Sequence, residues 1–197
     1  MKTLIRAVAP VVALVLALAG CSSSGSSSSS DGHNDADVEF ASEMVPHHEQ
    51  ALRMVAMTRG RDLSPQLEGL TQQIRAAQAP EIRTMEGWLD DWGEEADDDG
   101  HMMDGDGGMM NGSGGMMGGQ GGWRWMTGRD FHRLGGAPAQ AFEDMWLRMM
   151  IRHHQGAVAM SRDEVEHGEF PASIALAQHI EDSQQAEIEQ MRRMLAD

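Results

Sequence analysis

The chain has 197 residues, a formal net charge of −16 and a single cysteine. A protein this acidic repels phosphate, which argues against binding nucleic acid or anionic lipid through its general electrostatic field and favours the attraction of cations. One cysteine excludes a disulfide within the chain, so packing has to stabilise the fold.

The first residues have the features of an export signal. Lys2 and Arg6 give a basic start, residues 7–19 are apolar, and Leu-Ala-Gly precedes Cys21. The apolar stretch is too short to span a bilayer and fits a signal peptide over 1–20. The closing motif resembles the lipobox of bacterial lipoproteins, which implies lipid attachment to Cys21 and anchoring at the outer face of the bacterial cell membrane. The alternative is an ordinary signal peptide with an incidental cysteine.

A serine-rich tether and two helices are expected next. Residues 21–36 have the flexible, polar composition that an anchored domain needs. Over residues 37–92, apolar positions recur at steps of three and four, which predicts two packed helices. We expect Asp35 or Asp37 to cap the first helix and Gly60 to end it, and Ser64-Pro65 to begin the second.

Residues 93–122 differ in composition from both halves of the chain. The segment begins acidic and then consists mostly of glycine and methionine, so we expect a flexible linker. Its methionines form three doublets, and soft ligands in a flexible segment favour Cu(I) capture. Low-complexity drift and a sacrificial methionine pool for oxidants are the alternatives. The candidate ligands here are His101, Met102, Met103, Met109, Met110, Met116 and Met117.

The last part of the chain, residues 123–197, repeats the first at a constant offset of 106 residues. MVPHHEQALRM at 44–54 aligns with MIRHHQGAVAM at 150–160, and the alignment continues to residue 89 with 14 identities and no gap. Chance similarity does not keep register through a turn, so two tandem helical hairpins are predicted. Neither hairpin can bury its apolar face alone. We therefore expect one all-α, four-helix bundle with pseudo-twofold symmetry over residues 37–197, without strands.

Polar residues lie on the predicted core side of these helices. His47 and His153 lie on the apolar stripes of the first helix of each hairpin, and Glu81 and Glu187 on those of the second. Burying such groups is unfavourable unless they pair or bind a ligand. The pattern therefore indicates either a metal site or a structural network in which each glutamate accepts a hydrogen bond from a core histidine.

His48 and His154 lie one residue further on, about 100° around the helix. We expect them at the flank of the bundle, where they either form a second ligand set or face solvent.

Methionine bears on which metal such a site would hold. Di-iron and di-manganese bundles use Glu-x-x-His on facing helices, whereas this chain has Met-x-x-His at 44–47 and 150–153. Thioether sulfur in place of carboxylate disfavours iron and manganese and favours Cu(I). The candidate core ligands are His47, His48, His153, His154, Met44, Met54, Met150, Met160, Glu81 and Glu187.

The two His-His motifs, each followed by Q-x-x-E-I-x-x-M, resemble the domain-of-unknown-function family 305 over residues 37–92 and 139–195. The resemblance implies a ferritin-like four-helix bundle, often exported, in a family that includes a copper-binding member. By the same resemblance, the copper ligands are His47, His48, Met54, His153, His154 and Met160. The methionine-rich linker is not a general feature of the family, so its role rests on composition alone.

The sequence favours a lipid-anchored extracytoplasmic protein that sequesters, buffers or transfers copper through His and Met ligands. Its expected partners are metal ions and, through the lipid on Cys21, the membrane. We do not expect an enzyme, because there is no motif for nucleophilic catalysis, phosphate binding or dinucleotide binding. Two alternatives stay open: a ferritin-like oxidase with a core His/Glu metal centre, and a metal-free interaction module whose histidines are structural.

Overall fold

The computed structural model describes residues 32–96 and 126–196, all of which belong to one compact unit. In chain order the helices are α1 (Asp35–Ala56), α2 (Pro65–Trp92), α3 (Gly128–Gly135), α4 (Ala139–His167) and α5 (Pro171–Met194). No strand occurs among the described residues, and no helix there is long and apolar enough to cross a membrane. The predicted signal peptide, Cys21 and the methionine doublets of the linker lie outside the described residues.

Helix α1 begins with a reciprocal cap. The Asn34 side chain accepts hydrogen bonds from the backbone N–H groups of Ala36 and Asp37, and the Asp37 carboxylate accepts one from the backbone N–H of Asn34. This arrangement satisfies N–H groups that have no partner inside the helix. The predicted cap at Asp35 or Asp37 is therefore wrong, because Asn34 is the cap and Asp37 supports it from the first turn.

The turn between α1 and α2 follows the sequence more closely. Ser64 caps α2 by accepting the N–H of Leu67, and Pro65 is the first helical residue, as predicted. Helix α1 ends at Ala56, before the predicted end at Gly60, and Gly60 adopts a φ of 75° within the turn. Glycine tolerates this left-handed conformation because it has no Cβ.

Helix α3 is an element that the sequence did not predict. Thr127 and Asp130 form a capping box, in which each side chain accepts the other residue's backbone N–H. Leu134 is its only fully buried residue among those described, and eight residues are too few to show a helical period. Arg61 stabilises its end by donating to the carbonyl oxygen of Gly135 at 2.7 Å.

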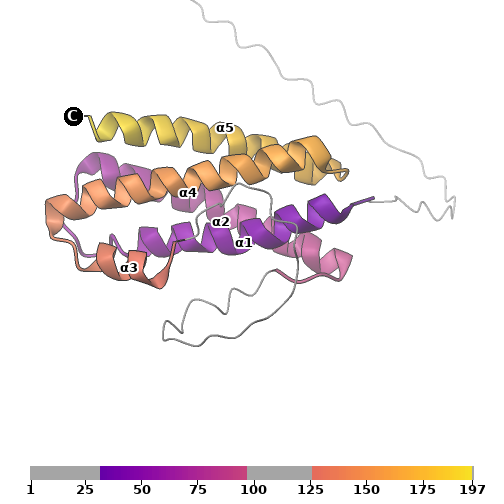
Figure 1. The fold of residues 1–197 in the computed structure, drawn as a ribbon, viewed down its shortest axis with the longest axis horizontal. Coiled ribbons are helices and arrows are strands. Elements are labelled where there is room, and N and C mark those ends of the chain that lie inside the picture. Colours follow the sequence, from indigo (N-terminus) through magenta and orange to yellow (C-terminus); the bar gives the residue numbers. More distant parts are fainter. Residues whose placement is uncertain (1–31, 97–125, 197) are drawn as a thin grey trace, which may run out of the picture. The chain divides into compact units, whose positions relative to one another are not determined.

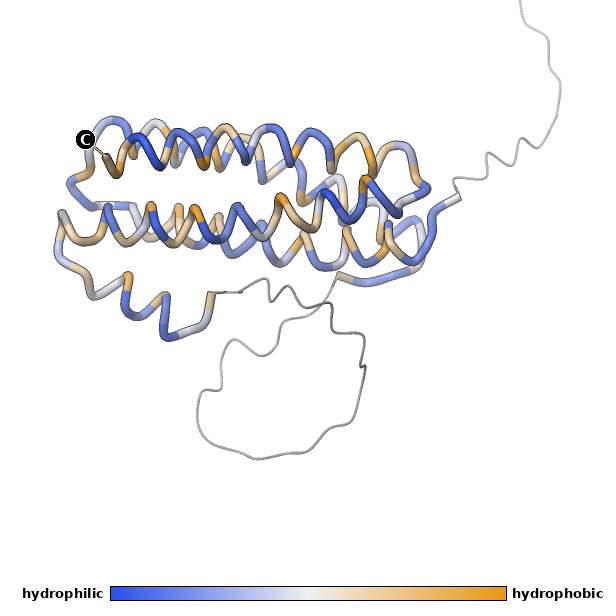
Figure 2. The backbone as a smooth tube through the Cα atoms, turned by 45° about the horizontal axis from the view of Figure 1, so that its top comes forward, coloured by the Kyte–Doolittle hydropathy of each residue, from blue (hydrophilic) through white to orange (hydrophobic). Residues whose placement is uncertain are grey.

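The four long helices form the predicted bundle (Figure 1). Helices α1 and α2 make one antiparallel hairpin, α4 and α5 make the second, and the two hairpins meet mainly through α1 and α4. Helix α3 lies at the end where α1 finishes and α4 begins. Hydrophobic and hydrophilic stretches are interspersed along each long helix in Figure 2. The fold is an all-α four-helix bundle of two tandem hairpins.

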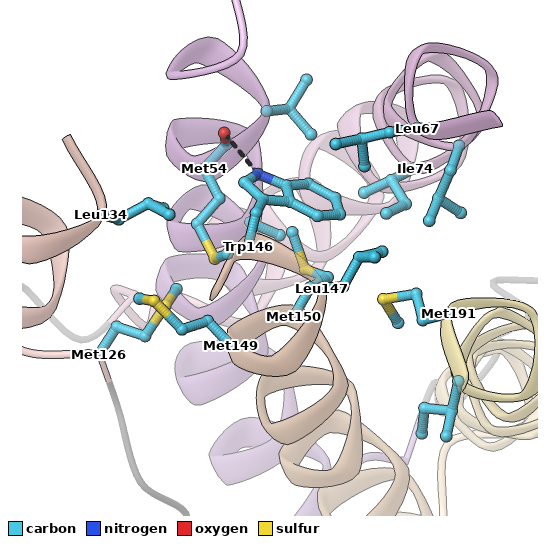
Figure 3. Packing of buried hydrophobic residues seen from close by; sticks show 14 of the residues in the cluster. Met54, Leu67, Ile74, Met126, Leu134, Trp146, Leu147, Met149, Met150 and Met191 are labelled. Atoms are coloured by element: carbon cyan, nitrogen blue, oxygen red, sulfur yellow. Dashed lines mark hydrogen bonds between the residues drawn. The ribbon is translucent and has the colours of Figure 1, made fainter. Parts of the chain in front are cut away.

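The apolar core is divided into two clusters along the bundle. One surrounds Trp146, whose indole N–H donates to the Met54 carbonyl oxygen at 2.9 Å (Figure 3). The other contains Phe40 and Ile180 and lies toward the start of α1. Each fully buried side chain of this size contributes roughly 1.5–3 kcal/mol to stability. Between the two clusters, all four long helices carry buried polar residues instead.

Candidate metal centre

A layer of buried polar side chains crosses the bundle between the two apolar clusters. No member is more than 7 % exposed. Each long helix contributes two side chains, and those of the second hairpin are the repeat counterparts of those of the first. The layer consists of His47, His48, Gln78, Glu81, His153, His154, Gln184 and Glu187. It has the pseudo-twofold symmetry that the sequence predicted.

Each hairpin contains one His–Glu pair within this layer. The Nε2 atom of His48 lies 2.9 Å from Oε2 of Glu81, and Nε2 of His154 lies 2.7 Å from Oε2 of Glu187. The sequence placed His48 and His154 at the flank of the bundle, and that prediction is wrong, because both are fully buried. The rotation of about 100° per residue turns each ring toward the second helix of its own hairpin.

His47 and His153 meet where the two repeats face each other. Their rings stack with centroids 3.7 Å apart and an interplanar angle of 26°, and Nε2 of His153 lies 2.8 Å from the carbonyl oxygen of His47. Burial lowers the pKa of both rings well below its usual value, and neighbouring histidines lower it further. Burial and the neighbouring histidines therefore favour the neutral form of both rings near neutral pH.

The hydrogen bonds fix which ring nitrogen is available to a ligand. Carbonyl and carboxylate oxygens can only accept, so Nε2 of His48, His153 and His154 carries the proton. In a neutral ring, Nδ1 then holds the lone pair. The Nδ1 atoms of these three histidines are buried and have no hydrogen-bond partner among the described residues. A buried lone pair beside an oriented N–H is the arrangement found in metal-ligating histidines.

The pKa of His154 is also consistent with a neutral ring. Burial lowers it, and the hydrogen bond and negative charge of Glu187 offset this only in part. A neutral ring keeps its lone pair near neutral pH, so no proton has to be removed before a metal binds.

Buried methionines flank the polar layer on both sides. They form two trios that correspond by the repeat, one in each apolar cluster: Met54, Met150 and Met191 in the first, and Met160, Met44 and Met85 in the second. Figure 3 shows the first trio around Trp146. The sequence named four of these residues as candidate ligands, and Met85 and Met191, which are equally buried, were not among them. Their position one helical turn after a core glutamate, in both repeats, was the signal that could have identified them.

The layer contains nitrogen and oxygen donors, but they are not gathered into one cluster. In the described part of the chain, no group of three or more His, Cys, Asp or Glu is arranged to hold a metal ion. The amides of Gln78 and Gln184 are also buried without a hydrogen-bond partner in the described residues.

Solved structures of related proteins share this fold. No curated protein matches the chain in sequence. A DUF305 fragment from Deinococcus radiodurans is 27% identical and has a TM-score of 0.66, with 83% of this chain and 97% of that one covered. A DUF305 protein from Streptomyces coelicolor is 28% identical and has a TM-score of 0.68, with 85% and 93% covered.

A third relative has been solved with metals. CopM in its Cu(I)-bound form is 28% identical, with a TM-score of 0.60 and coverage of 80% of this chain and 94% of that one. CopM structures also include Cu(II)-bound and Ag-bound forms. The family described as "Domain of unknown function (DUF305)" matches residues 37–195. This chain therefore belongs to the DUF305 family.

Proposed function

We propose that this protein binds copper, Cu(I) above all, in the polar layer between its hairpins, and that it sequesters, buffers or transfers the ion. The observation that carries the proposal is the set of buried Nδ1 lone pairs between two methionine trios. The relative CopM, which has been solved with Cu(I), Cu(II) and Ag, supports it.

The charge of the layer favours a monovalent soft ion. Imidazole nitrogen and thioether sulfur are uncharged ligands. They can bind copper in a dry core without adding negative charge to the buried site. Each half of the layer has one carboxyl group, held against His48 or His154. One carboxylate for one Cu(I) leaves each half neutral, whereas a divalent ion would leave an uncompensated buried charge.

The geometry suggests a different role for each residue type. His48 and His154 would ligate through Nδ1, with sulfur from Met44 and Met150, which lie one helical turn earlier. Glu81 and Glu187 would hold and orient these rings by accepting hydrogen bonds from their Nε2–H groups. The sequence grouped the two glutamates with the ligands. In this proposal they contact the histidines and not the metal.

Titration with Cu(I) against a competing chelator tests the proposal. We expect the wild-type protein to bind Cu(I), and His48→Ala plus His154→Ala to abolish binding by the core. His132→Ala plus His179→Ala is the matched control, because both of these histidines are exposed. If the folded core variant binds like the wild type, the layer is not the copper site. Comparison with His47→Ala plus His153→Ala shows whether the stacked pair contributes.

The other two functions predict different results. A ferritin-like oxidase would contain iron or manganese and turn over Fe(II) or Cu(I) in air, with Glu81 and Glu187 as direct ligands. A metal-free interaction module would show no change in melting temperature with any metal, because a ligand that binds only the folded state has to raise it.

We also propose that the protein is exported and anchored by lipid on Cys21, and that the methionine doublets of the linker bind additional Cu(I). The motif before Cys21 and the composition of residues 100–122 support these two points. Cys21→Ser should release the protein from the membrane fraction. Mass analysis of the mature amino terminus should show a diacylglyceryl-modified cysteine.

A further inference from the structure

A second group of buried polar residues lies at one end of the bundle, apart from the candidate metal centre. Asp37 of α1, Ser161 and Glu164 of α4, and Ser173 of α5 are each at most 1 % exposed. The group connects the start of α1 with the turn between α4 and α5.

The Asp37 carboxylate is well supplied with hydrogen bonds. Its Oδ2 accepts the backbone N–H of Asn34 at 2.7 Å and that of Glu169 at 3.1 Å, and its Oδ1 accepts that of Phe170 at 3.0 Å. Burial raises the pKa of Asp37, but these backbone hydrogen bonds and the neighbouring Glu164 side chain outweigh burial and leave the pKa below its usual value. Asp37 therefore keeps its negative charge at neutral pH.

Glu164 faces this charge without comparable support. Its two carboxyl oxygens are buried and have no well-formed hydrogen bond among the described residues. Burial raises the pKa of Glu164 to about 7; the Ser173 hydroxyl from α5 lowers it, whereas Asp37 from α1 and Asp163 from the same helix raise it. Two buried carboxyl groups that act on each other cannot both carry a charge at low cost, so Glu164 is the one that holds a proton.

The internal repeat shows that the fold does not require a buried acid at the position of Glu164. The counterpart of Asp37 is Glu143, whose carboxylate accepts the backbone N–H and the hydroxyl of Ser64, at the start of α2. Both acids thus join the first helix of one hairpin to the second helix of the other. However, the counterparts of Ser161, Glu164 and Ser173 are Val55, Thr58 and Leu67. The buried glutamate and its two serine neighbours are present at one end only.

The Glu164 carboxyl group is closely packed on the side of the α4–α5 turn. A Cβ atom added to Gly168 would lie 2.5 Å from Oε1 of Glu164 and 2.8 Å from its backbone oxygen, so the carboxyl group is pressed against the α4–α5 turn. The described residues offer no third His, Cys, Asp or Glu to hold a metal ion here. A proton is the cation that needs no additional space or ligands.

We propose that Asp37 and Glu164 form a proton-operated latch that closes this end of the bundle. When Glu164 is protonated, it donates its O–H to the Asp37 carboxylate and holds α4 against the start of α1. When the proton is lost, the two buried carboxylates repel each other, and the start of α1 and the α4–α5 turn loosen. This would expose the apolar cluster that contains Met44, Met85 and Met160.

Hydrogen exchange of the metal-free mature protein tests the latch independently of copper. After correction for intrinsic rates, protection of the start of α1 and the α4–α5 turn should be greatest at or below the usual Glu pKa of 4.5. It should fall by up to about tenfold per pH unit as the pH rises to about 7, and then level off. The opposite end, around Ser64 and Glu143, should not show this dependence.

Two variants separate a latch from a structural contact. Glu164→Gln donates to Asp37 at every pH, so this end should stay protected throughout the range. Glu164→Thr copies the counterpart Thr58, removes the titration, and serves if the glutamine variant fails to fold. Glu143→Gln is the control and should keep the wild-type pH dependence at the Asp37 end. Protection at that end that does not change with pH in the wild type, or the same pH dependence in a folded Glu164 variant, would overturn the proposal.

Discussion

At His153, one backbone carbonyl oxygen determines the chemistry of the ring. The His47 carbonyl oxygen accepts a hydrogen bond from Nε2–H of His153. In the neutral ring, Nδ1 is then the nitrogen that holds the lone pair. Glu81 and Glu187 do the same for His48 and His154. In the proposed copper site the glutamates would act on the metal without touching it, because they fix the orientation and the tautomer of each ring.

This role predicts a graded effect of replacing the glutamates. Glu81→Gln plus Glu187→Gln keeps an oxygen that accepts a hydrogen bond from Nε2–H but removes the charge that would balance Cu(I) in the dry core, so copper affinity should fall. Glu81→Ala plus Glu187→Ala removes the acceptor as well, so affinity should fall further; loss of the orienting hydrogen bond alone is expected to cost roughly 10–100-fold. Competition with a Cu(I) chelator measures both. If the alanine variant keeps wild-type affinity while remaining helical, the orienting role is wrong.

At the scale of helices, the turn between α4 and α5 depends on a glycine without needing its conformational freedom. Gly168 has an ordinary φ of −68°, but a Cβ atom there would collide with Glu164. In α2, by contrast, Gly87 is exposed and has nothing within 4 Å of an added Cβ.

The two glycines therefore predict opposite results for the same substitution. Gly87→Ala should raise the free energy of unfolding by roughly 0.5–1 kcal/mol, because alanine loses less backbone entropy in a helix. Gly168→Ala should lower it, because the turn has to move away from the Glu164 backbone. Urea unfolding followed by circular dichroism measures both. A stabilised Gly168→Ala variant would show that this contact is loose in solution.

Most of the fold at this scale was predictable, because the ungapped repeat and the helical period act over many residues. The hairpins and the buried His/Met stripes followed from them, and the start of α2 followed from the Ser64-Pro65 cap. Helix α3 did not, because it depends on one capping box and one buried leucine. The direction of His48 was also missed. Periodicity gives the angle of a side chain around its helix, but only the packed bundle shows that α2 lies at that angle.

For the whole molecule, two kinds of buried group make stability depend on pH in opposite directions. Burial lowers the pKa of His47, His153 and His154 below the usual 6.5, so their contribution is present above 6.5 and is lost as pH falls. The raised pKa of Glu164 gives a contribution that is present below 4.5 and is lost as pH rises to about 7. Between 4.5 and 6.5 the two partly cancel.

Removing the Glu164 carboxyl group should reveal the pH dependence that the buried histidines cause. In the Glu164→Gln variant, the free energy of unfolding should fall more steeply than in the wild type as the pH is lowered from 6.5 to 4.5, because the histidine contribution is no longer opposed. Urea unfolding at a series of pH values, followed by Trp fluorescence, measures this. Parallel profiles for the two proteins would mean that Glu164 does not bind its proton in the way its surroundings suggest.

The methionine-rich linker can be tested separately from the bundle. Deleting residues 100–122 should lower Cu(I) capacity and leave helicity and melting temperature nearly unchanged, because loop length alters closure entropy only weakly. Replacing its six methionines by leucine keeps apolar surface and removes sulfur. An unchanged Cu(I) stoichiometry in the leucine variant would leave the linker as a spacer.

The most direct test of copper binding by the core is nitrogen-15 NMR of the imidazole rings of the leucine-substituted linker variant, before and after one equivalent of Cu(I) per site. Cu(I) is diamagnetic, so the ring nitrogens remain visible. We predict that His48 and His154 keep their Nε2 protons while their Nδ1 resonances shift. Unshifted Nδ1 resonances in a protein that has taken up copper, or a shift confined to exposed histidines, would contradict the proposed site.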